Sequence, residues 1–361
     1  MNQLSQLSIK TPALIIDAEV MENNMKVMRD WLRGKNVRLR PHFKTPKTPI
    51  IAWKQMEYGA SGVCAQKLGE TEVLVNAGIK DVLLTNQIVD EVKIGKLVNL
   101  RKYSEVKVLV DNAENVKVLS RYARRKGVNL GVLVESDVGM TRCGLSNAKE
   151  ALELAKLVDK SDGLAFKGLQ CYSGHLQMAD LTMGKEKKIE ECKKVCDKIR
   201  ETKEFFDKEG VHPELVTGAG TGTYKYEYSE LNEIQPGSYI FMDWKYKRAA
   251  PEFDIALKLL ATVVSTPSRD RAIIDAGLKA ISTDGGMPIL KGMEGVECII
   301  RSEEHGILKI NDPTIRFNIG DKVEIYPSHC DTTINLHDNY YVTRKDDLEA
   351  IWEISARGKF Y

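Results

Sequence analysis

The sequence lacks a long apolar run and an excess of charge of one sign. No stretch of its 361 residues approaches a membrane span, and the first residues, MNQLSQLSIKTP, contain no apolar run after a basic one. Lys and Arg number 53 against 51 Asp and Glu, spread along the chain, so the basic stripe typical of nucleic-acid or membrane-surface binding is missing. We therefore expect a cytoplasmic protein with no nucleic-acid and no membrane partner.

The cysteines also lack the spacing of a structural framework. Of the seven, only Cys192 and Cys196 are close together, and their spacing is helical. An odd number without paired spacings argues against a disulfide framework and against a zinc-finger framework. No linker rich in Ser, Gly or Pro divides the chain, and 43% of its residues are hydrophobic, so it can bury a sizeable core.

A regular alternation of short apolar strands and helices is present instead. The pattern predicts a strand at 13–17 and a helix at 20–33, followed by about eight strand-plus-helix units. The strands of these units are predicted at 37–44, 62–65, 81–85, 106–110, 129–134, 166–171, 214–217 and 233–241. Eight such units predict a (β/α)₈ barrel with parallel strands, and an open doubly wound sheet is the alternative.

The sequence changes character at about Pro251. Strand-like runs then alternate with Gly, Asn, Asp and Pro turns, at 256–265, 271–275, 295–299, 307–310 and 322–326. This pattern predicts an all-β C-terminal domain after the barrel. We expect the barrel to occupy residues 17–248 and the β domain to combine 1–16 with 249–361.

Residues 38–47, RLRPHFKTPK, contain the first candidate for catalysis. As a strand end, their period of two places Arg40, His42 and Lys44 on one face. Cationic groups are costly to bury without partners, and a bound anion relieves that cost. A lysine near other cations has a lowered pKa, which suits attack on a carbonyl. Lys44 is therefore a candidate nucleophile, and a solvated basic strand edge is the alternative.

Further candidates follow later strands, because barrel enzymes gather their functional groups at the carboxyl ends of strands. The loop DVGMTRCG contains Arg142, and QCYSGHLQ contains Tyr172. TGAGTGTY, at 217–224, combines three glycines with hydroxyls at a strand-to-helix turn, which suits a phosphate. Each has a simpler alternative: a surface cation, a half-buried aromatic ring, and a turn that needs glycine regardless of any ligand.

Residues 326–338, YPSHCDTTINLHD, contain a candidate metal site. If 328–331 is extended, His329 and Asp331 share a face and Cys330 points away from it. Imidazole with carboxylate suits Mn²⁺, Mg²⁺, Fe²⁺ or Zn²⁺, with water or substrate completing the coordination. A hydrogen-bonded His and Asp at a turn is the alternative, and an inward Cys330 would favour a softer metal.

Together these stretches, from TPALIID to HCD, resemble one family. It comprises pyridoxal-phosphate enzymes of the alanine racemase-like fold that act on D-3-hydroxy amino acids, namely D-threonine aldolases and D-serine dehydratase-like proteins. The resemblance of RPHFKT implies that Lys44 forms the Schiff base, and His42, expected on the same strand face, is a second catalytic candidate. Arg142 of GMTRCG is implied to face the cofactor ring, and Tyr172 to contact the cofactor. The resemblance also implies phosphate contacts from GAGTGT and PGSY, by Gly220, Thr221, Gly222, Gly237, Ser238 and Tyr239.

The C-terminal signature of the family, SEEHG with HCDTTINLHD, implies that His329 and Asp331 bind a divalent metal, Mn²⁺ first and Mg²⁺ or Zn²⁺ as alternatives. With pyridoxal 5′-phosphate as cofactor, the implied reaction cleaves a D-3-hydroxy amino acid to glycine and an aldehyde. A His-x-Asp pair resembles the aldolase branch. The alternatives are a D-serine or D-3-hydroxyaspartate dehydratase, giving a 2-oxo acid and ammonia, and a non-catalytic pyridoxal-phosphate protein. The resemblance further implies a homodimer.

Overall fold

The computed structural model describes residues 9–345 and 347–361, and the chain forms two compact units. The barrel unit contains residues 31–44, 49–237 and 359–361, and the β unit contains the described residues up to Asp30, 45–48 and 238–358. These bounds differ from the expected ranges, because residues 17–30 and 238–248 cluster with the β strands. Residues 1–8 of the expected β domain lie outside the described residues. None of the described helices combines the length and apolar composition needed to cross a bilayer.

The barrel unit is built on eight parallel strands among the described residues, in the order β2-β9-β8-β7-β6-β5-β4-β3. They are β2 (Arg38–Leu39), β3 (Val63–Ala65), β4 (Asp81–Gln87), β5 (Glu105–Val110), β6 (Leu130–Glu135), β7 (Leu164–Cys171), β8 (Leu215–Gly218) and β9 (Glu233–Ile234). β2 pairs with β9, and just beyond β2 His42 forms a parallel bridge with Cys64 of β3. This bridge joins the two ends of the sheet, so the predicted (β/α)₈ barrel is confirmed.

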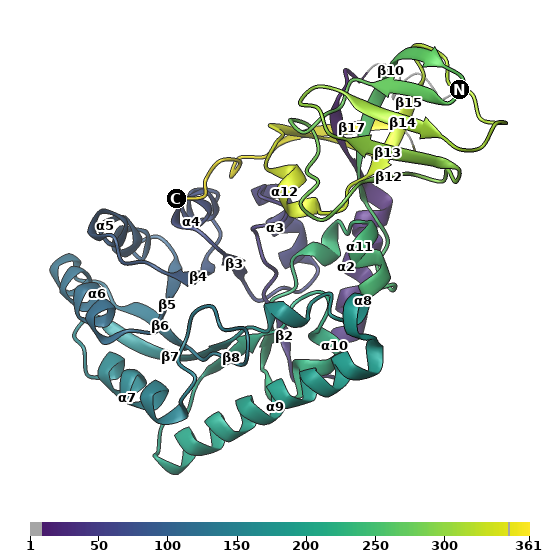
Figure 1. The fold of residues 1–361 in the computed structure, drawn as a ribbon. Helices are drawn as coiled ribbons and strands as arrows, with labels where there is room; N and C mark the ends of the chain where they lie inside the picture. Colours follow the sequence, from purple (N-terminus) through teal and green to yellow (C-terminus); the bar gives the residue numbers. More distant parts are fainter. Residues whose placement is uncertain (1–8, 346) are drawn as a thin grey trace. The chain divides into compact units, whose positions relative to one another are not determined.

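Helices cover the outside of the barrel strands (Figure 1). They are α3 (Pro49–Glu57), α4 (Leu68–Asn76), α5 (Glu91–Leu100), α6 (Ala113–Lys126), α7 (Ala148–Asp159), α8 (Asp180–Met183), α9 (Lys185–Lys208) and α10 (Tyr224–Glu227), with the 3₁₀ turns η1 (Gly174–Leu176) and η2 (Tyr228–Glu230). Local signals set their ends. α6, for example, begins after Asn112, whose side chain accepts the Glu114 N–H, and ends at Gly127 in the left-handed conformation.

Two predicted strands are shorter in the structure than in the sequence analysis. The strand expected at 37–44 ends at Leu39, and the one expected at 233–241 ends at Ile234. Both continue into proline segments, at Pro41 and Pro236, and proline has no N–H for a sheet ladder. Isolated bonds replace the ladder there, including the one from the His42 N–H to the Pro236 carbonyl at 3.2 Å.

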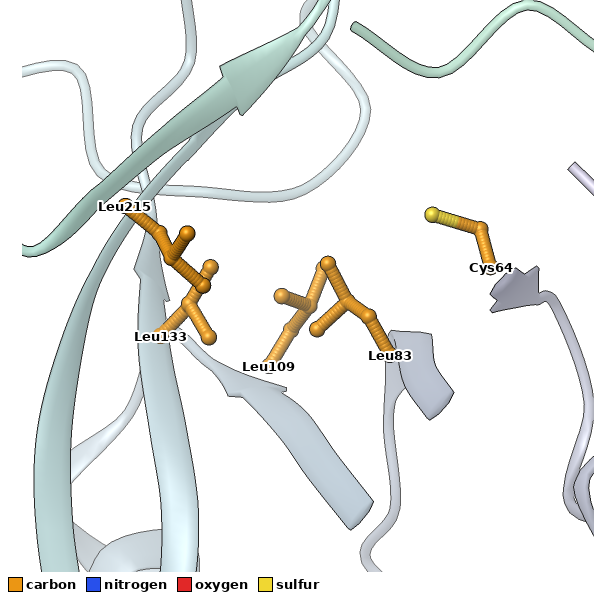
Figure 2. Close-up of a cluster of buried hydrophobic side chains, with 5 residues drawn as sticks. All are labelled: Cys64, Leu83, Leu109, Leu133 and Leu215. Carbon is orange, nitrogen blue, oxygen red and sulfur yellow. The ribbon is translucent and has the colours of Figure 1, made fainter. Parts of the chain in front are cut away.

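The middle of the barrel is a layer of apolar side chains (Figure 2). One inward residue from each of five strands forms it: Cys64, Leu83, Leu109, Leu133 and Leu215, each no more than 2% exposed. Because successive side chains on a strand alternate between its faces, the residues two positions away on either side also point inward. This apolar layer separates a charged layer at the amino ends of the strands from a polar cavity at their carboxyl ends.

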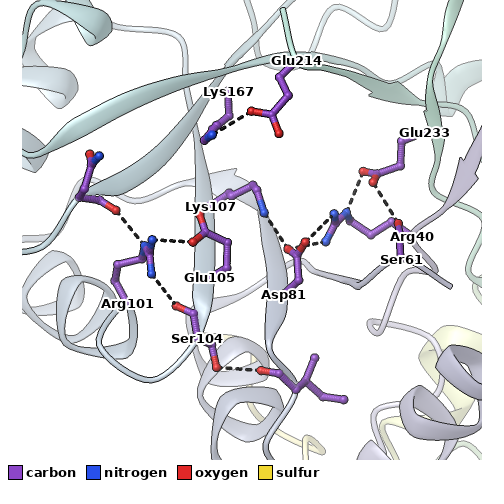
Figure 3. A network of polar contacts seen from close by, with 12 residues as sticks. Arg40, Ser61, Asp81, Arg101, Ser104, Glu105, Lys107, Lys167, Glu214 and Glu233 are labelled. Atoms are coloured by element: carbon purple, nitrogen blue, oxygen red, sulfur yellow. Dashed lines mark hydrogen bonds and ion pairs between the residues drawn. The ribbon is translucent and has the colours of Figure 1, made fainter.

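The charged layer is a paired network, not an exposed patch (Figure 3). The Arg40 guanidinium contacts Glu233 at 2.7 Å and Asp81 at 2.8 Å, and Lys107 contacts Asp81 at 2.7 Å. Gly62 leaves space for Arg40, since a Cβ at that position would collide with the guanidinium. Burial alone would raise the pKa of Asp81, but Arg40 and Lys107 lower it overall. Arg40 thus completes its charge pairing inside the barrel.

The β unit contains a nine-stranded sheet among the described residues, whose main path is β13-β14-β11-β10-β1-β16-β17. Its strands are β1 (Ala13–Asp17), β10 (Leu257–Ser268), β11 (Arg271–Ile274), β12 (Ile289–Leu290), β13 (Val296–Ile300), β14 (Gly306–Ile310), β15 (Lys322–Tyr326), β16 (Asn339–Arg344) and β17 (Asp347–Glu353). Its helical elements are α2 (Ala18–Leu32), which ends in the barrel unit, η3 (Ser238–Ile240), α11 (Trp244–Ala249) and α12 (Cys330–Ile334). The sequence analysis identified the β domain but missed β12, β16, β17 and α12.

Candidate active site

One cavity at the carboxyl ends of the barrel strands brings four predicted residues together. Lys44 and His42 follow β2, Arg142 lies in the loop after β6, and Tyr172 follows β7, and all four line this cavity. The Arg142 guanidinium lies over the Tyr172 ring, 5.8 Å from its centre. The rest of the lining is polar and comes from Gln66, Thr85, Glu135, Gln170 and Gln235.

Arg40 does not line this cavity, contrary to the expectation that it shares one space with His42 and Lys44. It belongs to the layer below, where Asp81 and Glu233 already neutralise it. The expectation that a bound anion relieves the burial of Arg40 is therefore wrong, because two carboxylates of the protein do so. The two carboxylates come from strands far along the chain, and the sequence alone did not identify them as its partners.

His42 is held on both sides of its ring. Its Nδ1 accepts the Lys44 backbone N–H at 3.3 Å, and its Nε2 lies 3.1 Å from the Thr85 hydroxyl. The Thr85 hydroxyl also donates to the Ala65 carbonyl at 3.0 Å, so it accepts from His42. This pattern fits a neutral imidazole with its proton on Nε2. In this arrangement His42 fixes the backbone that carries Lys44.

Acidic groups lie next to Arg142. Glu135 lines the cavity at the end of β6, and burial raises its pKa although the charge of Arg142 opposes the shift. Atoms of Asp111, Glu135 and Cys143 that could bind a metal lie within 4.8 Å of one another. Gln87 donates its side-chain amide to both carboxylates, so hydrogen bonding satisfies this cluster without an ion.

The predicted phosphate loop, TGAGTGTY, runs from β8 to α10. The Gly220 N–H donates to the Thr223 hydroxyl at 3.1 Å, and the Gly222 N–H donates to the Gln177 side chain at 2.9 Å. A Cβ on either glycine would collide with Gln177. These two glycines are therefore required by the close approach of Gln177, and their amides are already used within the protein.

The second predicted phosphate segment, PGSY, is divided between the two units. Gly237 is the last residue of its stretch in the barrel unit, whereas Ser238 and Tyr239 begin η3 in the β unit. Thr221, the remaining predicted residue of the first loop, is buried in the barrel unit. The roles of all these residues toward a phosphate stay predictions.

In the β unit, His329 and Asp331 lie at the start of α12. His329 is extended and precedes the helix, and Asp331 lies in its first turn, so the expected extended run over 328–331 is wrong beyond His329. Asp243 fixes this start, since its carboxylate accepts the Cys330 N–H at 3.0 Å. Burial raises the pKa of Asp243 to about 6, even though two backbone N–H groups donate to it.

Asp284 was missed by the sequence analysis and holds His329 in place. Its carboxylate lies 2.6 Å from Nδ1 of His329, while its other oxygen accepts the hydroxyls of Ser282 at 2.6 Å and Thr332 at 2.7 Å. Burial works against the charge, but the bonds from Ser282, His329 and Thr332 lower the pKa of Asp284 to about 2. With its Nδ1 proton directed to Asp284, His329 presents the lone pair of Nε2.

The residues present fit both groups that the resemblance implies. An amine, a guanidinium, a phenol ring and several amides share one cavity, which suits covalent attachment and orientation of pyridoxal phosphate. His329, oriented by Asp284, and Asp331 in the first turn of α12 offer the imidazole and carboxylate donors that suit a borderline or hard divalent metal.

Comparison with known proteins agrees with this geometry. The alanine racemase, N-terminal domain family model matches residues 16–244, and the "Putative serine dehydratase domain" model matches residues 256–343. The 3-hydroxy-D-aspartate aldolase of Paracoccus denitrificans (strain Pd 1222) is 37% identical, over 99% of this chain and 95% of that protein. The chain belongs to the D-threonine aldolase and D-serine dehydratase-like family.

Two solved structures support the same membership in this pyridoxal-phosphate fold family. The D-threonine aldolase from Filomicrobium marinum is 37% identical and covers 100% of this chain and 99% of that one, with a TM-score of 0.96. A D-threo-3-hydroxyaspartate dehydratase variant, described as a metal-free form, is 25% identical and covers 97% of this chain and 99% of that one, with a TM-score of 0.83.

Proposed function

We propose that this family member is a pyridoxal-phosphate lyase that uses a divalent metal to cleave D-3-hydroxy amino acids to glycine and an aldehyde. The observation that carries this proposal is the pair of donor residues at the start of α12, an imidazole fixed by Asp284 and, two residues later, the Asp331 carboxylate. Nitrogen and oxygen donors suit an ion that ligates a substrate hydroxyl. The aldolases in the comparison are also more similar to this chain, at 37% identity, than the dehydratase at 25%.

The cofactor would be held by the cavity of the barrel unit. When bound, pyridoxal phosphate supplies a ring that accepts the electron pair released at the substrate Cα. Lys44 would attach through Nζ to the cofactor aldehyde, and the hydrogen bond from its backbone N–H to His42 would fix the direction of approach. Arg142, whose guanidinium lies over the Tyr172 ring, would face the cofactor ring. Because a guanidinium does not give up its proton, the nitrogen of the cofactor ring would stay unprotonated.

The metal would be held by Nε2 of His329 and by the Asp331 carboxylate. A divalent ion, when bound, lowers the pKa of a hydroxyl that it ligates. In the proposed reaction the β-hydroxyl loses its proton, the Cα–Cβ bond breaks to give the aldehyde, and the electron pair stays at Cα until a proton adds to form glycine. Mn²⁺ is the first choice, with Mg²⁺ and Zn²⁺ as alternatives. The cytoplasm remains the predicted compartment.

Dehydration is the second candidate function, because the C-terminal segment matches the serine dehydratase domain model. In that reaction Lys44 Nζ would take the α-proton and the β-hydroxyl would leave, so that a 2-oxo acid and ammonia are formed. The same residues serve both reactions, and the outcome depends on which bond at Cα is broken.

The products that the purified protein forms distinguish aldol cleavage from dehydration. The protein is incubated with pyridoxal phosphate, Mn²⁺ or Mg²⁺, and D-threonine, D-serine or D-3-hydroxyaspartate in both β configurations. Glycine with acetaldehyde from D-threonine, or with glyoxylate from D-3-hydroxyaspartate, is the expected result. If every substrate yields only a 2-oxo acid and ammonia, the aldolase proposal fails and the dehydratase takes its place.

A further inference from the structure

A buried hydrogen-bond network connects the loop after β8 to the segment after β7. Its members are Ser173, Gln177, Thr223 and Glu227, with exposed fractions of 0%, 5%, 0% and 0%. Ser173 donates to the Glu227 carboxylate, with Oγ at 2.6 Å and 2.7 Å from its two oxygens. Gln177 donates to the Thr223 hydroxyl at 3.0 Å. None of these four residues lies in the lining of the Lys44 cavity.

The Thr223 hydroxyl has one proton, and its neighbours determine where that proton points. It accepts the Gly220 N–H at 3.1 Å and the Gln177 amide at 3.0 Å, so its own proton goes to Glu227 at 3.1 Å. The Gly222 N–H donates to the other end of the Gln177 side chain at 2.9 Å. Thr223 and Gln177 therefore hold both ends of the GTG turn, and Glu227 sets the direction of the Thr223 hydroxyl.

Glu227 is an expensive residue to place here for packing alone. Burial raises its pKa to about 7 although Ser173, Thr223 and Cys192 all donate to it. Lys188, on α9, is also buried, and it anchors the opposite side of the network by donating to the Gln177 carbonyl at 3.0 Å and to Asp180 at 2.9 Å. An apolar side chain would fill the same space at lower cost, which indicates that the network serves the loop above it.

We infer that Thr223, Gln177 and Glu227 are positioning residues that fix the loop 218–222 in the conformation that receives the cofactor phosphate. This inference rests on the proposed binding of pyridoxal phosphate. It assigns Gly220 and Gly222 a different role from the one expected from sequence: their N–H groups shape the loop and do not themselves donate to the phosphate. Because the loop is fixed before the ligand arrives, binding does not have to order it.

Pyridoxal, which lacks the phosphate, separates positioning of this loop from general damage to the cavity. Apo-protein is titrated with pyridoxal phosphate and with pyridoxal, and the Kd for each is measured from the absorbance of the bound ligand. The variants are Thr223→Val, which keeps the shape but removes the hydroxyl, and Thr223→Ser, which keeps the hydroxyl. The matched control is Thr202→Val, which removes a buried hydroxyl that bonds to the Lys198 carbonyl of its own helix.

We expect Thr223→Val to raise the Kd for pyridoxal phosphate at least about tenfold, while the Kd for pyridoxal changes less than about twofold. Thr223→Ser and Thr202→Val should bind both ligands like the wild type. The inference would be overturned if Thr223→Val and Thr223→Ser had equal Kd values for pyridoxal phosphate. It would also be overturned if Thr223→Val raised the Kd values for pyridoxal phosphate and pyridoxal by the same factor. If Thr223→Val does not fold, Gln177→Met takes its place, with the same selective loss expected and the same results overturning it. A wild-type protein that binds no pyridoxal phosphate would refute the proposed function instead.

Discussion

Replacing Asp284 by Asn should weaken metal binding by disturbing the tautomer of His329. Asp284 accepts two hydroxyls on one oxygen and faces Nδ1 of His329 with the other, at 2.6 Å. In Asp284→Asn, the oxygen of the amide can keep the two hydroxyls only if its NH₂ faces Nδ1. Nδ1 then becomes an acceptor, the ring proton moves to Nε2, and the lone pair proposed to bind the metal is lost.

The expected size of this effect follows from the exposure of the pair. Loss of a residue that orients a metal-binding histidine costs about 10–100-fold in metal affinity, or about 1.4–2.8 kcal/mol. The Asp284 side chain is 47% exposed and that of His329 is 29% exposed, so water screens their interaction. We therefore expect the lower end, a Kd for Mn²⁺ about tenfold higher than in the wild type.

Isothermal titration of chelator-treated protein with Mn²⁺ measures this Kd directly, and a titration of activity against Mn²⁺ measures it independently. The matched control is Asp312→Asn, which alters another aspartate of the β unit, a half-buried one whose carboxylate accepts the N–H and the hydroxyl of Thr314. Saturating Mn²⁺ should restore most of the turnover of Asp284→Asn. A Kd for Mn²⁺ unchanged in Asp284→Asn would show that Asp284 does not orient a metal ligand.

Four further outcomes are expected. Lys44→Ala should lack the visible absorbance of bound cofactor, and after borohydride reduction it should retain no cofactor. An absorbance band like that of the wild type would contradict covalent attachment at Lys44. Chelator should abolish turnover and leave that band in place, and full activity of Asp331→Ala in chelator would exclude the proposed metal site. Arg40→Met leaves Asp81 and Glu233 without their shared cation and should lower the free energy of unfolding by about 3–5 kcal/mol at neutral pH, as measured by urea titration. The pKa of Asp81 is lowered in the folded state, so its ion pair stabilises the protein above the ordinary carboxyl pKa and ceases to do so as the pH falls through the lowered value. The difference in free energy of unfolding between the wild type and Arg40→Met should therefore become smaller in acid. A difference that stays constant or grows would contradict the role of this ion pair. The homodimer prediction is tested by the mass in solution at micromolar concentration, and a monomer would refute it.

The sequence by itself determined the order and type of most elements. Hydrophobic periodicity located β1 at the residues where the structure has it and α2 to within two residues at each end, and the count of strand-plus-helix units predicted the barrel. It also predicted that Lys44, Arg142 and Tyr172 meet, because the carboxyl ends of parallel strands lie at one end of a barrel. These features are local or follow from topology alone, so a hydrophobic pattern with a period of two or 3.6 residues is enough to predict them.

Only the tertiary structure decided which polar groups pair. Arg40 meets Glu233, 193 residues away, His329 meets Asp284, 45 residues away, and Gln177 meets Thr223, 46 residues away. Such partners depend on strand register, on closure of the sheet and on how loops fold back, and side-chain periodicity encodes none of these. Arg40 therefore read as a candidate anion-binding residue although its charge is neutralised inside the barrel. The sequence analysis assigned no role to Asp284, Gln177 or Glu227, because a hydrogen bond between distant segments leaves no local signal in the sequence.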